Sequence, residues 1–148
     1  MACTVKCIVL VLISTVLALA TPLAQAQMTR AQVVASNLQN PWALAFLPDG
    51  RFLVTERPGR LRVIEPNGEV GEPVLGLPSM AAQGQGGLLD VLLDTDFVNN
   101  STLYFCFSEP GQGGNSTALA RARLSSDRLR LEGLKIIFSQ KPKVVSSA

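Results

Sequence analysis

Histidine is absent from the 148 residues. Imidazole is the most common general base in enzymes and the most common metal ligand in proteins. Its absence also excludes a Ser-His-Asp arrangement within this chain. The chain therefore lacks the side chain that most often serves as a general base or as a metal ligand.

Excess charge of either sign is also lacking. The chain has 13 Lys and Arg residues against 11 Asp and Glu residues, a net charge of +2. Nucleic-acid binding depends on neutralising many phosphates with clustered basic side chains. This near balance gives no electrostatic basis for a nucleic-acid partner.

The N-terminus has the pattern of an export signal. Lys6 precedes an apolar run over residues 8–19, and Ala24-Gln25-Ala26 forms an A-x-A cleavage site. A membrane anchor is the weaker interpretation, because the run falls short of the ~20 residues that span a bilayer. We predict a signal peptide at residues 1–26, a folded domain at residues 27–148, a periplasmic or secreted location and no membrane span after cleavage.

Cysteine is scarce in the expected folded domain. Cys3 and Cys7 would leave with the signal, so Cys106 would remain alone and no internal disulfide could form. Its neighbours in Tyr104-Phe105-Cys106-Phe107 are apolar or aromatic. We interpret Cys106 as a buried, unreactive thiol.

The remaining sequence is written as two similar units of short apolar segments and turns. Asp49 and Asp96 occupy matching turns 47 residues apart. A period of roughly 40–50 residues with several short strands is typical of a β-propeller blade. The predicted strands are 43–47, 52–55, 61–64 and 73–75 in the first unit, and 88–93, 102–107, 118–124 and 135–138 in the second. A further edge strand is expected at residues 32–35.

Two such units are too few for a closed ring. Propellers close with about 4–8 blades, because each sheet buries its faces against its neighbours. The expected fold class is therefore all-β, with about two to two and a half propeller blades forming the N-terminal part of a larger fold, and the tail at residues 141–148 offers no terminal strand. Open blade edges would allow self-association, or equally aggregation.

Three local features have competing interpretations. Asp90, Asp94 and Asp96 could suggest a cation site, but Asp94-Thr95-Asp96 is better explained as a β-turn. Residues 110–115 resemble a phosphate cradle but lack a following lysine or helix, which favours a flexible hairpin loop. Trp42 is interpreted as a packing anchor between blades rather than as a sugar-stacking platform.

Three motifs in order carry a family resemblance. They are N-P-W-A-L-A-F-L-P-D-G from Asn40, G-Q-G-G-L-L-D from Gly84, and I-F-S-Q-K-P-K from Ile137. Over about residues 33–143 the chain resembles the soluble aldose sugar dehydrogenases. These are pyrroloquinoline-quinone (PQQ)-dependent enzymes of the glucose/sorbosone dehydrogenase group.

The resemblance implies a six-bladed propeller with PQQ in a polar mouth and calcium ions that bind and polarise it. The anomeric carbon of an aldose gives a hydride to the quinone, a histidine takes the hydroxyl proton, and an external acceptor removes the electrons. Gln85 matches the family's cofactor-binding glutamine, and its amide can both donate and accept hydrogen bonds. The alternative is that Gln85 satisfies backbone groups in a tight turn. The glycines around it are expected to let the backbone approach a ligand.

The chain departs from the family after Lys143. In relatives this element continues into a turn bearing the catalytic histidine, whereas here Val144-Val145-Ser146-Ser147-Ala148 follows. The resemblance therefore places the catalytic histidine, the calcium ligands and the basic residues that grip the cofactor downstream. It implies a truncated N-terminal portion with no catalytic residue and no metal ligand of its own, which is inactive alone. The alternative is a non-catalytic propeller fragment that acts as a binding or assembly module, or an incomplete product that is degraded.

Overall fold

The computed structural model describes residues 29–145, so the signal peptide predicted at residues 1–26 lies outside the described residues. The chain divides into two units, Met1–Gln32 and Val33–Ala148, and every described strand belongs to the second. No helix within residues 29–145 has the length and hydropathy needed to cross a membrane.

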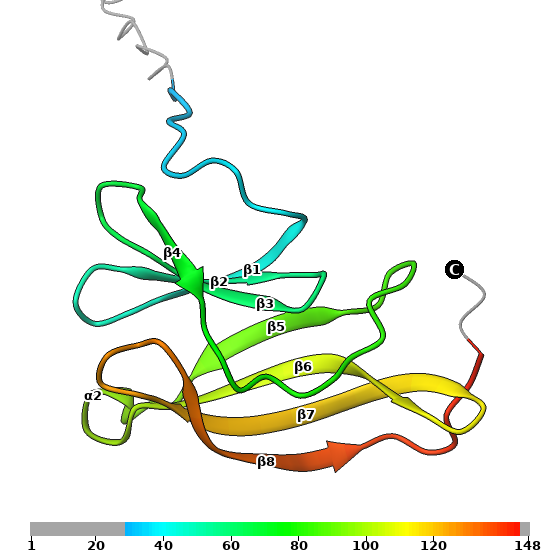
Figure 1. Ribbon diagram of the computed structural model, residues 1–148. Coiled ribbons are helices and arrows are strands. Elements are labelled where there is room, and N and C mark those ends of the chain that lie inside the picture. Colours follow the sequence, from blue (N-terminus) through cyan, green and yellow to red (C-terminus); the bar gives the residue numbers. More distant parts are fainter. Residues whose placement is uncertain (1–28, 146–148) are drawn as a thin grey trace, which may run out of the picture. The chain divides into compact units, whose positions relative to one another are not determined.

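The first sheet is a four-stranded antiparallel meander in the order β1-β2-β3-β4 (Figure 1). Its strands are β1 (Pro41–Phe46), β2 (Phe52–Glu56), β3 (Arg60–Ile64) and β4 (Val70–Pro73). The first three agree closely with prediction, because turns rich in proline, glycine and aspartate separate them. The fourth lies earlier than expected: the predicted segment at 73–75 overlaps it at Pro73 alone.

The second sheet repeats this order as β5-β6-β7-β8. Its strands are β5 (Leu88–Leu93), β6 (Thr102–Gly111), β7 (Gly114–Leu124) and β8 (Leu131–Ser139). The short helix α2 (Phe97–Asn100) connects β5 to β6. β5 begins and ends 47 residues after β1, as the repeat predicts. The all-β fold with two four-stranded propeller blades is confirmed, since each blade is a sequential antiparallel sheet.

Several sequence-based expectations are corrected here. Residues 32–35 form no strand, although Val33 and Val34 are apolar; they run without a partner strand toward β1. Residues 110–114 form the predicted hairpin with a shorter loop than expected, because β6 and β7 pair up to Gly111 and Gly114 and leave a two-residue turn. After β8 the described part of the tail forms no strand, and Val144 makes one isolated antiparallel bridge with Asn115.

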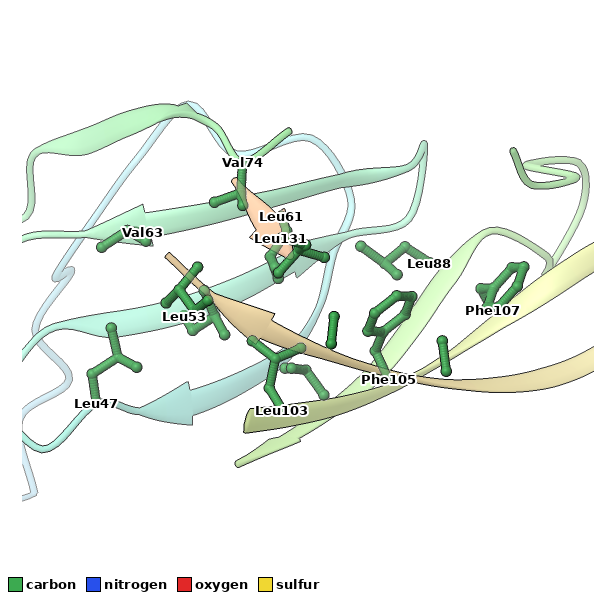
Figure 2. Packing of buried hydrophobic residues seen from close by; sticks show 14 of the residues in the cluster. Leu47, Leu53, Leu61, Val63, Val74, Leu88, Leu103, Phe105, Phe107 and Leu131 are labelled. Atoms are coloured by element: carbon green, nitrogen blue, oxygen red, sulfur yellow. The ribbon is translucent and has the colours of Figure 1, made fainter. Parts of the chain in front are cut away.

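One hydrophobic cluster joins the two sheets. Figure 2 shows side chains from both, among them Leu53, Leu103 and Phe105, gathered together. β7 alternates buried and exposed residues along most of its length, which places Ala118, Ala120 and Ala122 in this core. The second sheet contributes these alanines together with Phe105 and Phe107, and the first sheet contributes leucines and valines to the same cluster.

The opposite face of the first sheet carries exposed apolar side chains. Trp42, Leu44 and Phe46 alternate along β1 and are 49%, 49% and 71% exposed. The expectation that Trp42 anchors packing between blades is therefore not met for the two described sheets. Trp42 instead lines an apolar pocket of about 330 Å³ together with Val34 and Leu38.

Candidate functional site

The loop of residues 81–87, here called the rim loop, lies where the ends of the two sheets meet. It joins β4 to β5 and gathers with the β6–β7 turn and the C-terminal tail at one end of the sheets, here called the rim end (Figure 1). The Leu88 amide donates to the Arg57 carbonyl at 3.0 Å, and the Ser108 amide donates to the Gly87 carbonyl at 2.9 Å. The rim loop is thus fixed to both sheets.

Two glycines permit this close packing. A Cβ on Gly87, whose φ is +129°, would lie 1.9 Å from the Arg57 carbonyl oxygen. A Cβ on Gly86 would lie 2.6 Å from the Ala81 carbonyl oxygen. The expectation that the motif's glycines serve ligand approach is corrected for these two: they let the protein's own backbone pack.

Gln85 projects from the rim loop and is exposed. Its side-chain Oε1 accepts a hydrogen bond of 3.2 Å from Nη1 of Arg57. Among residues 29–145 its Nε2 donates no hydrogen bond, so the amide does not satisfy backbone groups of its own turn. The cofactor role of Gln85 stays a prediction.

A buried carboxylate adjoins Arg57 and was missed by the sequence reasoning. The Glu56 side chain is fully buried, and its Oε2 accepts hydrogen bonds from Nε of Arg60 at 2.6 Å and of Arg62 at 3.1 Å. Its Oε1 accepts from the Gln39 amide. The signal was available, since Glu56, Arg60 and Arg62 lie on two strands joined by a tight turn.

The charge on Glu56 is stabilised in place. Burial works to raise the pKa of Glu56, but the hydrogen bonds from Arg60, the Gln39 amide and Arg62, with the positive charge of Arg60, outweigh it and hold that pKa below its ordinary value. The ionised carboxylate therefore ties the segment before β1 to the β2–β3 hairpin that presents Arg57.

A second ion pair fixes the tail at the rim end. Nζ of Lys143 donates to Glu109, and so does the hydroxyl of Ser139. The hydrogen bond from Lys143, followed by that from Ser139, lowers the pKa of Glu109. The Asn115 amide donates to the Val144 carbonyl at 2.9 Å, so the tail runs along the start of β7.

Of the three aspartates considered as a possible cation site, Asp94 and Asp96 form the predicted turn and Asp90 lies on β5. Asp94 Oδ1 accepts from the Asp96 amide at 2.9 Å, and Asp94 Oδ2 accepts from the Tyr104 hydroxyl at 2.9 Å. The hydrogen bonds from the Asp96 amide, Asn100 and Tyr104 lower the pKa of Asp94. Within residues 29–145 no cluster of three His, Cys, Asp or Glu side chains is arranged to hold a metal ion.

Cys106 is half-buried rather than fully buried, on the face of β6 that points away from the core. Burial, with a smaller contribution from the charge of Asp90, raises the pKa of its thiol. A raised pKa disfavours the reactive thiolate, which agrees with the interpretation of Cys106 as unreactive.

Comparison with known families decides the lineage. Residues 38–148 match the Glucose / Sorbosone dehydrogenase family. The chain belongs to that family. It is 40% identical to the aldose sugar dehydrogenase YliI of Escherichia coli (strain K12) over 115 residues, which are 76% of this chain and 31% of that protein.

Solved structures give the same result. The crystal structure of a glucose dehydrogenase aligns with a TM-score of 0.76 at 45% identity, covering 78% of this chain and 34% of that one. The apo form of the soluble E. coli aldose sugar dehydrogenase aligns with a TM-score of 0.73 at 40% identity, covering 76% and 33%. The PQQ-bound aldose sugar dehydrogenase of Streptomyces coelicolor, at 24% identity, covering 78% and 34% with a TM-score of 0.67, shares the fold. The chain spans about a third of the length of these relatives.

Proposed function

We propose that this chain supplies two blades, and the cofactor-facing amide of Gln85, to a PQQ-dependent dehydrogenase that oxidises aldoses at the anomeric carbon and passes electrons to an external acceptor. The observation that carries the proposal is the position of Gln85. Its amide stands exposed on a loop that both sheets hold in place, with Oε1 bonded to Arg57. The family membership and the E. coli relative support the substrate class.

The residues at the rim end fit the chemistry of this cofactor. PQQ carries several carboxylate and carbonyl oxygens, which need hydrogen-bond donors and positive charge. Gln85 offers two amide protons, while its Oε1 accepts the hydrogen bond from Arg57. When bound, PQQ would provide the two-electron oxidising capacity that amino-acid side chains lack. The chain's own groups would orient it.

Other components of the reaction are proposed to come from outside these residues. With no histidine in the sequence, the chain has no imidazole to accept the proton of the sugar hydroxyl. We propose that calcium, which polarises the quinone in this family, is held by residues beyond those described here. General-base assistance contributes about 10²–10⁴-fold to such reactions, so the 148-residue chain alone should not turn over aldoses.

A chimera tests whether this segment is competent. Residues 38–143 would replace the matching segment of the E. coli aldose sugar dehydrogenase, which provides the remaining blades. We expect dye-linked oxidation of aldoses with added PQQ and calcium, and no turnover by the 148-residue chain under the same conditions. A folded chimera without activity would contradict the proposed role of the segment, and turnover by the chain alone would contradict the proposed division of labour.

The proposed location is the periplasm or the exterior of the cell. The A-x-A site at Ala24-Gln25-Ala26 supports it. Mass spectrometry of the secreted or periplasmic product should find an N-terminus at Gln27. Retention of residues 1–26 on the isolated protein would contradict export by this route.

A second candidate function is an assembly module without catalysis. The exposed apolar side chains of Trp42, Leu44 and Phe46 favour it, because they lie together along β1. Sedimentation distinguishes the candidates: a discrete oligomer of the 148-residue chain supports a module, whereas a monodisperse monomer argues against it.

A further inference from the structure

We propose that Arg57 is the positioning residue that sets the orientation of the Gln85 amide and thereby determines which of its groups faces a ligand. This inference rests on the proposed cofactor role of Gln85 and names how that role is organised. A glutamine amide can present either its oxygen or its nitrogen after rotation about its last side-chain bond. A contact of the amide with a neighbouring residue must therefore set which of the two groups faces the ligand.

Arg57 sets the orientation of the Gln85 amide through a hydrogen bond. Its Nη1 donates to Gln85 Oε1 at 3.2 Å. An arginine has N–H donors and no acceptor, so it can bind the oxygen of the amide but not the nitrogen. With Oε1 engaged, Nε2 is the group that Gln85 offers to the solvent side. A donor in that position suits a ligand rich in carboxylate and carbonyl oxygens.

The backbone of Arg57 is rigidly held, as a positioning residue requires. Its amide donates to the Asn40 carbonyl at 3.0 Å, and its carbonyl accepts from the Leu88 amide at 3.0 Å. The close approach to Gly87 leaves no room for a Cβ there. The Arg57 end of the Arg57–Gln85 hydrogen bond therefore starts from held backbone, and Gln85 lies two residues before the anchored Gly87.

The buried cluster next to Arg57 supports the same arrangement. Glu56 pairs with Arg60 and Arg62, so its charge is already matched. Arg57 is consequently not drawn into that cluster, and its guanidinium is available for Gln85.

The test uses the 148-residue chain, its Arg57→Met, Arg57→Lys and Gln85→Ala variants, and Arg121→Met as the charge-matched control. Arg121 lies exposed on β7. The first readout needs no cofactor: NMR signals of the Gln85 side-chain amide. We expect R57M to shift these signals and to speed exchange of the Nε2 protons, R57K to restore them in part, and R121M to leave them unchanged. Identical Gln85 signals in R57M and the unaltered chain would overturn the proposal.

The second readout is the affinity for PQQ, followed by its absorbance or fluorescence. We expect R57M to weaken binding about tenfold and R57K about threefold, the size of effect that loss of one hydrogen bond to a charged group produces. In the Q85A background R57M should cause less than a twofold further loss. An undiminished effect in Q85A would mean that Arg57 contacts PQQ itself, which contradicts a positioning role.

The two proposals fail separately. If the unaltered chain and the chimera both fail to bind PQQ, the proposed cofactor role of Gln85 is wrong. The claim that Arg57 prepares Gln85 for PQQ is then wrong as well. The amide signals still decide whether Arg57 orients Gln85. If PQQ binds and Q85A weakens binding but R57M does not, the proposed function stands and the positioning role of Arg57 is wrong.

Discussion

The two sheets end differently at equivalent positions. In the first sheet, Pro41 at the start of β1 pairs with Glu56 at the end of β2; in the second, Leu88 at the start of β5 pairs with Phe107 of β6. Glu56 is a buried carboxylate matched by two arginines, whereas Phe107 is a phenyl ring with 1% of its surface exposed. The residue that pairs with the start of the first strand is thus a buried ion-paired carboxylate in the first blade and a buried apolar ring in the second.

This difference has a consequence for the rim end. In the first sheet, β2 ends at the charged residue Glu56, and the next residue, Arg57, lies beside the rim loop. In the second sheet, the buried Phe107 is followed by Ser108, which forms two hydrogen bonds with the backbone of Gly87 and so holds the end of the rim loop. The first sheet therefore supplies the arginine that bonds to Gln85, and the second sheet supplies the hydrogen bonds that hold Gly87.

The largest effect is expected from Phe107→Ala. Removing a buried phenyl ring costs about 3–5 kcal/mol of unfolding free energy through lost burial and a residual cavity. Phe46→Ala is the matched control, since Phe46 is 71% exposed, and it should cost about 1 kcal/mol or less. Denaturant unfolding measures both. Equal losses of unfolding free energy would show that Phe107 is not part of a cooperative core. The claim that its apolar packing stabilises the second sheet would then be wrong.

Glu56→Gln should have a smaller effect that depends on pH. The neutral amide leaves Arg60 and Arg62 without their carboxylate, but these side chains remain 29% and 19% exposed and can regain water. We expect a loss of about 2 kcal/mol near pH 7, below the about 3–5 kcal/mol for a fully enclosed pair.

The pH dependence follows from the sign of the shift. The pKa of Glu56 is lower in the folded state than its ordinary value, so its stabilisation is complete above about pH 4.3 and disappears as the pH falls through the lower folded pKa. The deficit of E56Q should therefore shrink in acid, while that of F107A stays constant. Glu72→Gln, at an exposed position on β4, is the control. A deficit of E56Q that is flat from pH 7 to pH 3 would contradict a charged role.

Much of the fold was predictable because its signals are local. Turn residues and apolar segments fixed β2, β3 and β5 to within a residue or two, and the 47-residue period identified the second blade. Errors arose where a partner decided the outcome. The apolar pair Val33-Val34 has no neighbouring strand, whereas Gly111 and Gly114 extend a hairpin because β6 and β7 continue to pair.

The candidate site was predictable only in part. The resemblance pointed to Gln85, but its hydrogen bond to Arg57 joins residues 28 positions apart and has no local signal. Likewise, the reason for Gly87 emerged from its distance to the Arg57 carbonyl, and no property of the sequence around Gly87 reveals that neighbour. Contacts between the two sheets are set by their packing, which the pattern of one sheet does not encode.

The smallest predicted effect lies at the end of the sheets away from the rim. Arg128, in the turn between β7 and β8, pairs with Asp49, in the turn between β1 and β2, and the side chains are 30% and 33% exposed. Partly exposed ion pairs contribute about 0.2–1 kcal/mol, so a double-mutant cycle of Asp49→Asn and Arg128→Met should give a coupling in that range. The coupling should fall as salt rises from 0.05 to about 0.5 M, because mobile ions screen such pairs.

A second ion pair makes this cycle informative about the two sheets. Arg130 and Asp127 lie at 3.7 Å within the same turn, so the matching cycle of Asp127→Asn and Arg130→Met reports a contact inside one blade. If the Asp49–Arg128 contact helps to hold the blades together, its coupling should exceed that of the local pair and should grow when F107A has already weakened the core. A coupling of zero in the Asp49–Arg128 cycle would mean that this ion pair makes no electrostatic contribution to holding the blades together.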